Sequence, residues 1–335
     1  MNTFGRIFRV SVLGESHGQC AGVLIDGCPP GIKLCEADFL PDLERRKSGA
    51  KGTTPRRETD EPRIMSGIMD GKTTGAPVLV LFGNDSQDSS AYSGIRDIPR
   101  PGHADFTAMR KFSGMNDPRG GGHFSGRLTL GLVVAGAIAK KMLNKAEFHA
   151  ELISAGGRNK PEGFEKAIDA AVREKDSIGG IVECRIRGLP IGLGEPFFDS
   201  AESLLSHALF SIPGIKGVEF GAGFACAEMK GSLCNDALIE KNGKTRANNS
   251  GGINGGITNS NEVVFRIAVK PASSIGKAQK ALDIANGKET ELKIDGRHDA
   301  CIALRIPVIA EATSAMVFAD LSLLSLAYAD RNGTD

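Results

Sequence analysis

Five segments of the sequence place histidine, arginine or lysine next to glycine, and these residue types could bind an anion or transfer a proton. The segments are residues 14–18 (GESHG), 96–105 (RDIPRPGHAD), 119–127 (RGGGHFSGR), 248–259 (NNSGGINGGITN) with 270–274 (KPASS), and 296–299 (GRHD). Glycine allows the backbone to approach a ligand closely and to present its N–H groups to a phosphate. The third segment also precedes a predicted helix, whose positive N-terminal end favours an anion. The pattern therefore predicts a site for an anionic small molecule.

Histidine is the residue best suited to proton transfer near neutral pH. His17 and His103 lie in loops between glycines, where a histidine has little packing role. His149 and His207 lie in ordinary periodic segments, and we interpret them as structural. A single loop histidine is as readily a surface residue, but three loops with histidine, arginine and glycine in one chain favour an enzyme.

A basic segment begins at the end of the first predicted helix. It contains six basic side chains within 13 residues, Arg45, Arg46, Lys47, Lys51, Arg56 and Arg57. Two interpretations stay open: the segment is a solvated face, or it covers an anionic ligand.

Composition and charge disfavour several functional classes. The 335 residues carry 41 Lys and Arg against 40 Asp and Glu, a net charge of +1, so the basic excess typical of a nucleic-acid-binding protein is missing. Aromatic residues make up 5% of the chain, which disfavours single-strand binding by stacking. The sequence has no Walker A motif and no Gly-x-Gly-x-x-Gly after a strand, which disfavours the common nucleotide-binding folds.

The cysteines and the apolar runs predict where the protein works. The seven cysteines are an odd number without a Cys-x-x-Cys pair, which predicts a reduced, cytoplasmic protein with neither a zinc site nor a disulfide framework. We expect no signal peptide. We also expect no membrane span, because the longest apolar run, residues 128–139, is too short to cross a bilayer.

Hydrophobic periodicity predicts strands and helices mixed in one domain, residues 1–335, without a repeat or a linker. The predicted strands are residues 7–13, 21–26, 63–69, 77–83, 147–156, 180–188, a glycine-rich region at 214–231, 262–270 and 300–305. The predicted helices are residues 36–47, 104–113, 127–145, 163–175, 199–210 and 307–328. We expect long loops at 47–63 and 84–102 and a frayed tail at 329–335.

Six blocks of the sequence resemble the chorismate synthase family and follow one another in the family order. They are GESHG followed by GVLIDGCPPG, RPGHAD, RGGGHFSGR, SIPGIKGVEFGAGF, the stretch from GGINGGI to KPASS, and GRHDAC. The resemblance extends from about Phe4 to Ala327. It implies an α+β fold, a β-α-β sandwich with antiparallel sheets around internal helices, assembled as a homotetramer.

The resemblance also implies an activity. Chorismate synthases are carbon–oxygen lyases of the shikimate pathway, which leads to the aromatic amino acids. The implied reaction removes phosphate from 5-enolpyruvylshikimate 3-phosphate by 1,4-anti elimination, and it requires reduced FMN although it has no net redox change. NADPH or an external flavin reductase is the implied source of reduced flavin, and neither metal, nucleic acid nor membrane is implied.

Site residues follow from the same resemblance, position by position. The implied catalytic residues are His17, which protonates the leaving phosphate, His103, which protonates the reduced flavin, and Asp299, which assists deprotonation through the flavin. The implied substrate-binding residues are Arg46, Arg100, Ser125, Arg127 and Arg297. The implied FMN-binding residues are His123, Phe124, Ser125, Asn235, Asp236, Gly255, Lys270, Pro271, Ala272, Ser273, Ser274 and Arg297. Arg46 is also implied in NADP binding.

The sequence departs from the commoner family pattern at several positions. His123 stands where an arginine is common, Gly52 where a second arginine often follows the first pair, and Ala272 where a threonine is usual. Lys51, beside Gly52, could cover a phosphate only as a less directional charge. Two interpretations of His123 stay open: its charge binds the flavin phosphate, or its ring or backbone packs against the flavin.

Two other functional classes are weaker. Loss of His17, His103 or Asp299 would favour a flavin- or phosphosugar-binding protein without lyase activity, and all three residues are present. A nucleic-acid-binding module built on the basic segment is disfavoured by the net charge and by the small number of aromatic residues.

Overall fold

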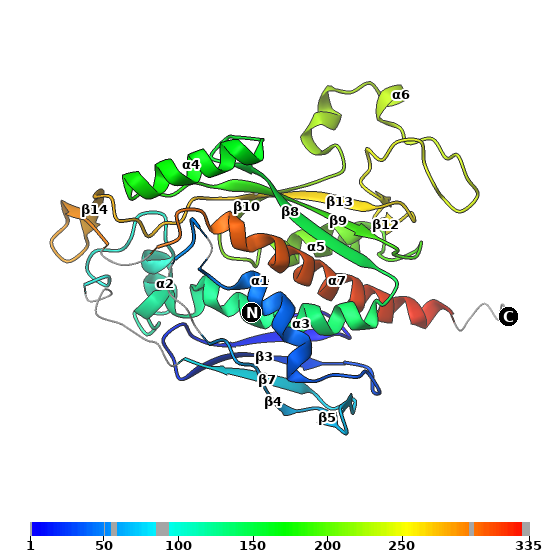
Figure 1. The fold of residues 1–335 in the computed structure, drawn as a ribbon, viewed down its shortest axis with the longest axis horizontal. Coiled ribbons are helices and arrows are strands. Elements are labelled where there is room, and N and C mark those ends of the chain that lie inside the picture. The colour runs from blue at the N-terminus through cyan, green and yellow to red at the C-terminus, as the bar shows by residue number, and fades with distance from the viewer. Residues whose placement is uncertain (1, 50, 55–58, 85–93, 295–297, 330–335) are drawn as a thin grey trace.

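Two antiparallel sheets enclose a pair of long apolar helices in this computed structural model (Figure 1). The structure describes residues 2–49, 51–54, 59–84, 94–294 and 298–329. In Figure 1 the first sheet lies below the helices and the second lies above them, with one further helix on the outer side of the second sheet. This arrangement is an α+β sandwich and confirms the predicted fold class of antiparallel sheets around internal helices.

The first sheet is built from the N-terminal quarter of the chain. Its strands follow the order β1 (Thr3–Phe4), β2 (Arg9–Gly14), β3 (Cys20–Asp26), β7 (Val78–Gly83) and β4 (Arg63–Ser66), each antiparallel to the next. In the central strand β3, Ala21, Val23 and Ile25 are fully buried. This alternation places one face of a strand on a core, and here that face packs against α3 (Thr129–Met142).

The second sheet uses the middle of the chain. Its strands follow the order β10 (Ile215–Phe220), β13 (Val263–Val269), β9 (Gly180–Arg187) and β8 (Glu147–Ala155), again antiparallel. Helix α7 (Ile306–Ala329) packs against β8 and β9 from inside, and α4 (Pro161–Glu174) lies on the outer side (Figure 1). Helix α5 (Ala201–Leu209) packs against α7.

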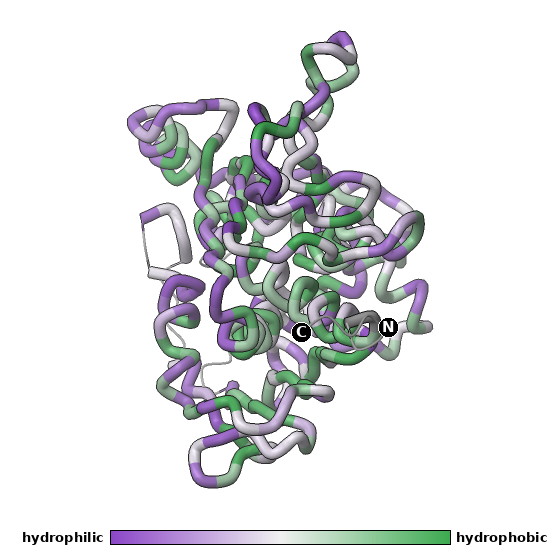
Figure 2. Tube along the Cα trace, turned by 90° about the vertical axis from the view of Figure 1, so that its right-hand side faces the viewer, coloured by the Kyte–Doolittle hydropathy of each residue, from purple (hydrophilic) through white to green (hydrophobic). Residues whose placement is uncertain are grey.

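A flap, defined here as residues 221–250, follows the edge strand β10 and projects above the second sheet (Figure 1). It contains a 3-10 helix (Gly223–Glu228) and the one-turn helix α6 (Gly231–Cys234). Figure 2 shows hydrophobic stretches within this projecting part. Phe224 is 83% exposed and Leu233 is 70% exposed, so the flap presents apolar side chains to solvent in a single chain.

The helices α3 and α7 form the centre of the molecule. Every residue of α3 from Thr129 to Ala139 is buried, because the first sheet covers one side and α7 covers the other. Gly136 makes the close approach possible: a Cβ at this position would overlap the Cα and Cβ of Ala312 and lie 2.8 Å from its carbonyl oxygen. The backbones of the two helices therefore touch at this point.

Helix α7 corrects the expectation about apolar runs. Residues Ile302–Ala327 are long and apolar enough to cross a membrane, and 78% of the most apolar window is buried inside the protein. The run at 128–139 is therefore not the longest apolar segment. Because the second sheet, α3 and α5 enclose α7, this helix is apolar on nearly all sides, as a buried central helix must be.

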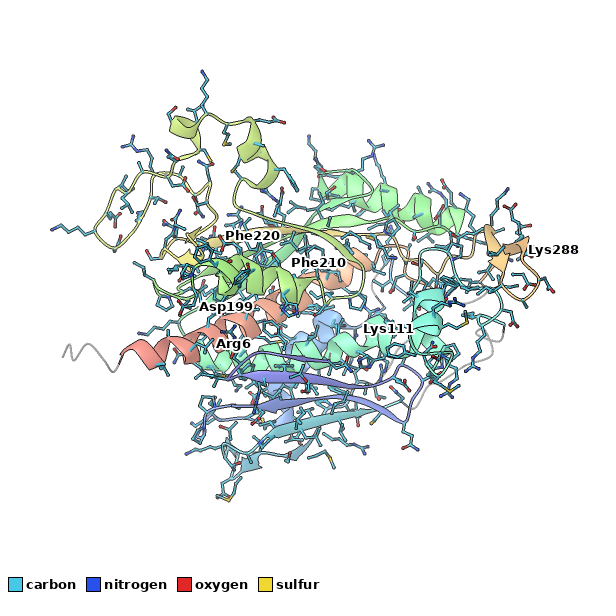
Figure 3. All side chains as sticks on the ribbon, turned by 180° about the vertical axis from the view of Figure 1, so that it is seen from behind. Arg6, Lys111, Asp199, Phe210, Phe220 and Lys288 are labelled. Atoms are coloured by element: carbon cyan, nitrogen blue, oxygen red, sulfur yellow. The ribbon has the colours of Figure 1, made fainter. Side chains whose placement is uncertain are left out.

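Two buried carboxylates on α7 connect distant parts of the chain. Asp320 accepts hydrogen bonds from the backbone N–H groups of Arg6 (2.9 Å), Ile7 (2.7 Å) and Phe8 (2.9 Å). Arg6 continues this connection through an ion pair with Asp199, at 2.6 Å (Figure 3). The N-terminal segment is thereby attached to the C-terminal helix.

Glu311 forms the second connection. Its carboxylate accepts hydrogen bonds from both terminal nitrogens of Arg45 (2.8 and 2.7 Å), from the ammonium group of Lys140 (3.0 Å) and from the backbone N–H of Ala150 (3.0 Å). Burial raises the pKa of Glu311, but the bond from Arg45 and the charges of Lys140 and Arg45 outweigh it, so the pKa lies below its usual value. This carboxylate ties α1 (Leu40–Arg46), α3 and β8 to α7.

Several predicted elements differ from the observed ones. Residues 300–305 are not a strand, since Ile302–Arg305 forms a 3-10 helix that leads into α7. In the region 214–231 only β10 is a strand, and the rest belongs to the flap. A short apolar run has no clear period, which explains the first error.

The remaining helices and hairpins are short. The helices are a 3-10 turn at Glu36–Phe39 before α1, α2 (Asp105–Lys111), 3-10 turns at Arg119–Phe124 and Gly126–Leu128 before α3, and a 3-10 turn at Phe197–Asp199. The sequence-based prediction missed three hairpins: β5 (Ile68–Met69) with β6 (Lys72–Thr73), β11 (Ile253–Asn254) with β12 (Ile257–Thr258), and β14 (Gln279–Asp283) with β15 (Lys288–Leu292). The strands of the first two hairpins have only two residues each, which is too short for a detectable alternation.

The contact at Gly136 predicts the effect of one added methyl group. Gly136→Ala should destabilise the protein by about 1–3 kcal/mol, because a well-packed helix crossing has to move apart. Gly231→Ala is the matched control, since Gly231 is also helical and a Cβ there meets nothing within 4 Å. Urea unfolding midpoints measure both changes, and a Gly136→Ala midpoint equal to that of Gly231→Ala would contradict the close packing.

Candidate active site

A cavity of about 1130 Å³ lies where loops of the first half of the chain meet the segments that precede α7. Most of the sequence-predicted residues line it: Arg46, Arg100, His103, His123, Phe124, Ser125, Arg127, Lys270, Pro271, Ala272, Ser273, Ser274 and Asp299. The volume exceeds the range of roughly 300–1,000 Å³ that usually holds one drug-sized ligand. The cavity therefore has room for two small molecules side by side.

Two of the predicted arginines share one buried carboxylate. Arg46 donates from Nη2 to Oδ2 of Asp60 at 2.6 Å, and Arg127 donates from Nη1 to Oδ1 at 2.8 Å. Burial raises the pKa of Asp60, but the charges and hydrogen bonds of both arginines outweigh it and lower the pKa. Arg127 is held further by Asn84 Oδ1 at 2.6 Å. Because one carboxylate balances two guanidinium groups, the cluster keeps a net positive charge.

Arg46 has hydrogen-bond donors to spare. Its side chain is almost fully buried, and its Nε and Nη1 atoms have no hydrogen-bond partner among the described residues. Burial lowers the pKa of Arg46 to about 10, with Arg127 and Arg305 acting in the same direction and Asp60 opposing it, so the group stays charged at neutral pH. A buried cation with open donors on a cavity wall is suited to receive an anion.

A second carboxylate organises Arg100 and His103. Asp105 Oδ1 accepts from His103 Nδ1 at 2.6 Å and from Arg100 Nη2 at 2.7 Å, and its Oδ2 accepts from Arg100 Nε at 2.7 Å. Burial raises the pKa of Asp105, but these hydrogen bonds outweigh it and hold the pKa well below its usual value. With Nδ1–H directed to Asp105, Nε2 of His103 is the ring nitrogen left for chemistry. A Cβ at Gly121 would lie 3.4 Å from that atom.

The glycine loop at residues 119–127 separates His17 from the cavity. Gly120, Gly121 and Gly122 have φ values of 58°, 83° and 54°, a conformation that residues with a Cβ adopt only with strain. His17 is buried and does not line the cavity, whereas Gly120 does. A Cβ at Gly120 would lie 2.6 Å from Nε2 of His17. His17 therefore lies directly behind the main chain of Gly120, and only a glycine fits between them.

His123 at the end of this loop is held by the first sheet. Its Nδ1 donates to the carbonyl oxygen of Gly14 at 2.7 Å, which leaves Nε2 as its free nitrogen. His123 also lines a smaller adjoining cavity of about 240 Å³, together with His207. The ring of His207 packs edge-on against Phe4, with centroids 5.6 Å apart. The interpretation that the charge of His123 binds the flavin phosphate therefore requires this phosphate to lie near Nε2.

The segment 270–274 is fixed to the loop that carries His103. Lys270 donates to Ser273 Oγ at 3.1 Å and to the carbonyl oxygen of Gly102, and Ser273 Oγ donates to the same oxygen at 2.8 Å. Arg100 donates to Ser274 Oγ at 3.0 Å. The predicted phosphate-binding cation and hydroxyls therefore surround one corner of the cavity.

Asp299 also lines the cavity. Its Oδ1 accepts the backbone N–H of Thr54 at 2.6 Å, and its Oδ2 accepts from Arg305 at 3.2 Å. Arg305 in turn donates to the carbonyl oxygen of Arg46 at 2.8 Å. These contacts fix the carboxylate next to the helix end that carries Arg46.

Some predicted residues do not reach this cavity. Asn235, Asp236 and Gly255 lie in or near the flap and do not line it. Asp236 accepts the backbone N–H groups of Asn249 (2.9 Å) and Ser250 (2.8 Å), which anchors the flap. Arg297 falls outside the described residues.

The residues of the basic segment differ in their surroundings, so that part of the segment covers the cavity and part is a solvated face. Arg46 lines the cavity, whereas Lys51 is 66% exposed and pairs with Asp169 on α4 at 2.9 Å. At Gly52, with φ of 87°, a Cβ would lie 2.5 Å from the side chain of Ile168, so an arginine does not fit this position. Arg56 and Arg57 fall outside the described residues.

The sequence-based prediction missed several residues of the site. Asp60 carries no spacing signal within its polar loop, whereas Asp105 could have been suspected because it follows His103 by two positions. Ser16 and His298 also line the cavity. Burial lowers the pKa of His298, and its Nε2 has no hydrogen-bond partner among the described residues.

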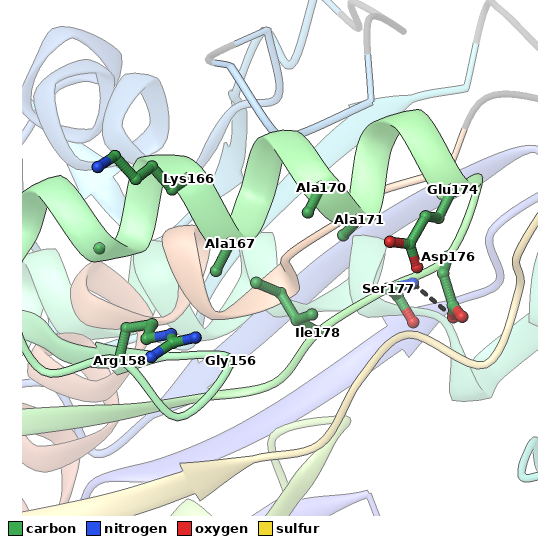
Figure 4. Close-up of a pocket in the computed structure, with 11 residues that line it drawn as sticks. Gly156, Arg158, Lys166, Ala167, Ala170, Ala171, Glu174, Asp176, Ser177 and Ile178 are labelled. Atoms are coloured by element: carbon green, nitrogen blue, oxygen red, sulfur yellow. Dashed lines mark hydrogen bonds between the residues drawn. The ribbon is translucent and has the colours of Figure 1, made fainter.

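A further cavity of about 490 Å³ lies between α4 and the turn at residues 176–178 (Figure 4). None of the sequence-predicted site residues that the structure describes lines it. Ser177 on its wall donates from Oγ to the carbonyl oxygen of Ala272 at 2.7 Å. The wall of this cavity is therefore bonded to the segment 270–274.

The low pKa of Asp105 predicts a pH-dependent contribution to stability. Its folded pKa lies below the unfolded value of about 4, so its stabilisation is complete above pH 4 and is lost as the pH falls toward the folded pKa. Asp105→Asn should lower the free energy of unfolding at pH 7 by as much as about 3–5 kcal/mol, because Arg100 then lacks its buried partner. The difference from wild type should start to shrink as the pH falls below about 4, as measured by urea unfolding.

Asp169→Asn serves as the control for this experiment. Its ion pair with Lys51 is exposed, and such pairs contribute about 0–1 kcal/mol. A wild-type to Asp105→Asn difference that stays constant from pH 7 to pH 3 would show that the charge of Asp105 does not stabilise the fold.

Comparisons with known proteins agree with this geometry. Residues 8–323 match the family model described as chorismate synthase. A chorismate synthase of Chitinophaga pinensis is 58% identical over 325 residues, which is 97% of each chain. A chorismate synthase of Methanosarcina barkeri is 45% identical over 353 residues, 97% of this chain and 96% of that one. A crystal structure of chorismate synthase superposes with a TM-score of 0.74 at 26% identity, covering 96% of this chain and 93% of the other. The chain therefore belongs to the chorismate synthase family of lyases.

Proposed function

We propose that this chain converts 5-enolpyruvylshikimate 3-phosphate into chorismate in the large cavity, with reduced FMN as cofactor. The observation that carries the proposal is the buried pair Arg46 and Arg127 on Asp60, with open donors on Arg46. A substrate with one phosphate and two carboxylates needs several fixed guanidinium groups. We assign Arg100, Ser125 and Arg297 to the same substrate.

The residues present fit a flavin beside the substrate. The cavity volume suffices for two ligands, and the segment 270–274 offers one cation and hydroxyl groups suited to a phosphate. His123, Phe124 and Ser125 offer a flat ring surface and polar groups on the adjacent wall. When bound, reduced FMN supplies an electron-rich ring that assists the elimination without net redox change. We assign these residues to it.

The roles of the three catalytic residues follow their positions. His103 is assigned to transfer a proton at Nε2, because its Nδ1 is bonded to Asp105. His17 is assigned to protonate the leaving phosphate, since its ring lies against Gly120, a residue of the cavity wall without a side chain. Asp299 is assigned to receive the substrate proton, and its contacts with Thr54 and Arg305 hold the carboxylate in a fixed orientation.

The flavin has to be reduced before the reaction. We assign Arg46 to NADPH if the protein reduces its own flavin, and otherwise an external flavin reductase supplies it. Aerobic NADPH oxidation by the purified protein with FMN and no added reductase distinguishes the two routes.

We propose that the single domain of 1–335 assembles as a homotetramer in the cytoplasm. Exposed apolar side chains such as Phe224, Leu233 and Leu238 on the flap, and Phe197 and Phe198 beside α5, support burial in an interface. Asn235, Asp236 and Gly255 do not line the cavity of their own chain, so they could contact FMN only from a neighbouring subunit. Light scattering of the FMN-bound protein measures the oligomeric state. The free cysteines support the cytoplasmic setting.

The requirement for reduced flavin is the direct test of function. The purified protein should form chorismate from 5-enolpyruvylshikimate 3-phosphate under anaerobic conditions once dithionite has reduced added FMN. It should form none with oxidised FMN. Formation of chorismate without any flavin would exclude the proposed cofactor, and FMN binding without chorismate would indicate a binding protein that lacks lyase activity.

The two loop histidines should differ from a histidine on the surface. A positioned acid typically contributes a factor of roughly 100 to 10,000, so His17→Ala and His103→Ala should each slow chorismate formation at least about tenfold while FMN still binds. His149→Ala is the matched control, because His149 is exposed on β8. Rates under saturating substrate and reduced FMN measure the effect. Equal rates for all three variants would show that these histidines do not act as acids.

A further inference from the structure

Two cysteines of the flap are in contact. Cys234 donates a hydrogen bond from its Sγ to Sγ of Cys226, with the sulfurs 3.6 Å apart. All seven cysteines of the chain are free thiols. A disulfide bond is about 2 Å long, so bonding these two sulfurs requires each to move by less than about 1 Å.

Local backbone structure brings the two thiols together. The backbone N–H of Met229 bonds to the carbonyl oxygen of Cys226 and ends the first helical turn. Helix α6 begins after Lys230 and ends at Cys234. Asn249 donates from its side chain to the carbonyl oxygen of Cys234 at 3.2 Å, which fixes that end of the helix. The folded backbone of the flap therefore holds the two thiols in contact.

The surroundings leave the pair accessible to a small oxidant. Both cysteines are only partly buried. Cys184 and Cys301, in contrast, are fully buried in the core, where burial raises the pKa of each thiol and disfavours the reactive thiolate.

The two sulfurs are not equivalent. The hydrogen bond that Cys234 donates to Cys226, together with burial and the charge of Asp236, raises the pKa of Cys234. Cys234 directs its S–H at Cys226, which is the acceptor sulfur of the pair. We therefore assign the first attack to Cys226 and the second to Cys234.

We propose that Cys226 and Cys234 form a reversible dithiol–disulfide site whose oxidant is hydrogen peroxide. The Cys226 thiolate attacks one peroxide oxygen, so an S–O bond forms, the O–O bond breaks, and hydroxide leaves and is protonated to water. Cys234 then gives up its proton and attacks the Cys226 sulfur. The S–S bond forms as the S–O bond breaks, and a second water leaves. Two thiols lose two electrons and one peroxide becomes two waters.

Oxidation of the pair would link two helical turns of the flap covalently. The disulfide joins the 3-10 helix to α6, directly before Asn235 and Asp236. The source of the oxidant rests on the proposed function: reduced flavin yields hydrogen peroxide when it meets dioxygen, so the oxidant would arise on the same protein. The chemistry of the pair itself needs no flavin.

The test uses the full-length protein without flavin. Protein freed of reductant is treated with hydrogen peroxide, alkylated and digested with trypsin without reduction. Trypsin cleaves after Lys230, between the two cysteines, so the disulfide joins the peptides 217–230 and 231–241. The joined species should appear in wild type and separate on addition of dithiothreitol. Oxidation of Cys35 without the joined species would overturn the proposal.

Three variants make the test specific. Cys226→Ser and Cys234→Ser should each abolish the joined species, whereas Cys35→Ser, which removes an exposed cysteine, should leave it intact. In Cys234→Ser, dimedone should trap a sulfenic acid on Cys226, while Cys234 should remain a thiol in Cys226→Ser. Trapping on Cys234 alone would overturn the assigned order of attack. Because no flavin or substrate is present, these outcomes are independent of the lyase assay.

Discussion

The close contact between α3 and α7 is the constraint on which the rest of the structure depends. Both sheets use these two helices as their shared core, and the active-site loops enter or leave them: the glycine loop precedes α3, and Asp299 precedes α7. Gly136 and Ala312 set how near the helices lie. Small residues at a crossing let two helix backbones approach closely. The distance between the two helices, and with it the spacing of the sheets around them, therefore depends on a few very small residues.

Buried carboxylates with several donors each connect this core to its surroundings. Asp320 and Glu311 on α7 accept backbone and side-chain donors and attach distant segments. Asp60 and Asp105 do the same at the cavity, but their partners are the arginines and the histidine of the site. In each case a buried anion is stabilised by more than one hydrogen bond, which offsets the cost of removing it from water. The same physical device thus serves both the fold and the site.

The cavity differs from the core networks in its charge balance. Asp60 neutralises only one of the two guanidinium groups that it holds, and Arg46 keeps open donors. An arrangement of this kind is electrostatically incomplete without an anion, and it is preorganised because the arginines are already held in place. Lys51 does not take part, since it pairs with α4 on the outside. Under the proposed function, the departure from the common family pattern at Gly52 assigns phosphate binding to the buried arginines.

Sequence alone determined the elements with a strong period and the loops with unusual composition. The strands at 21–26 and 77–83, the apolar helices and the histidine, arginine and glycine loops all follow from local residue order, because burial on one face and backbone freedom are local properties. Tertiary structure alone decided what those loops form together. Asp60 acquires its role only when Arg46 and Arg127, 14 and 67 positions away in the sequence, meet at its carboxylate. His17 lies behind Gly120 because two loops distant in sequence meet there. The contact of Cys226 with Cys234 is likewise invisible in their spacing of eight residues, since it depends on how the flap folds back. Such contacts depend on distances between segments, and the order of residues does not specify distances in space.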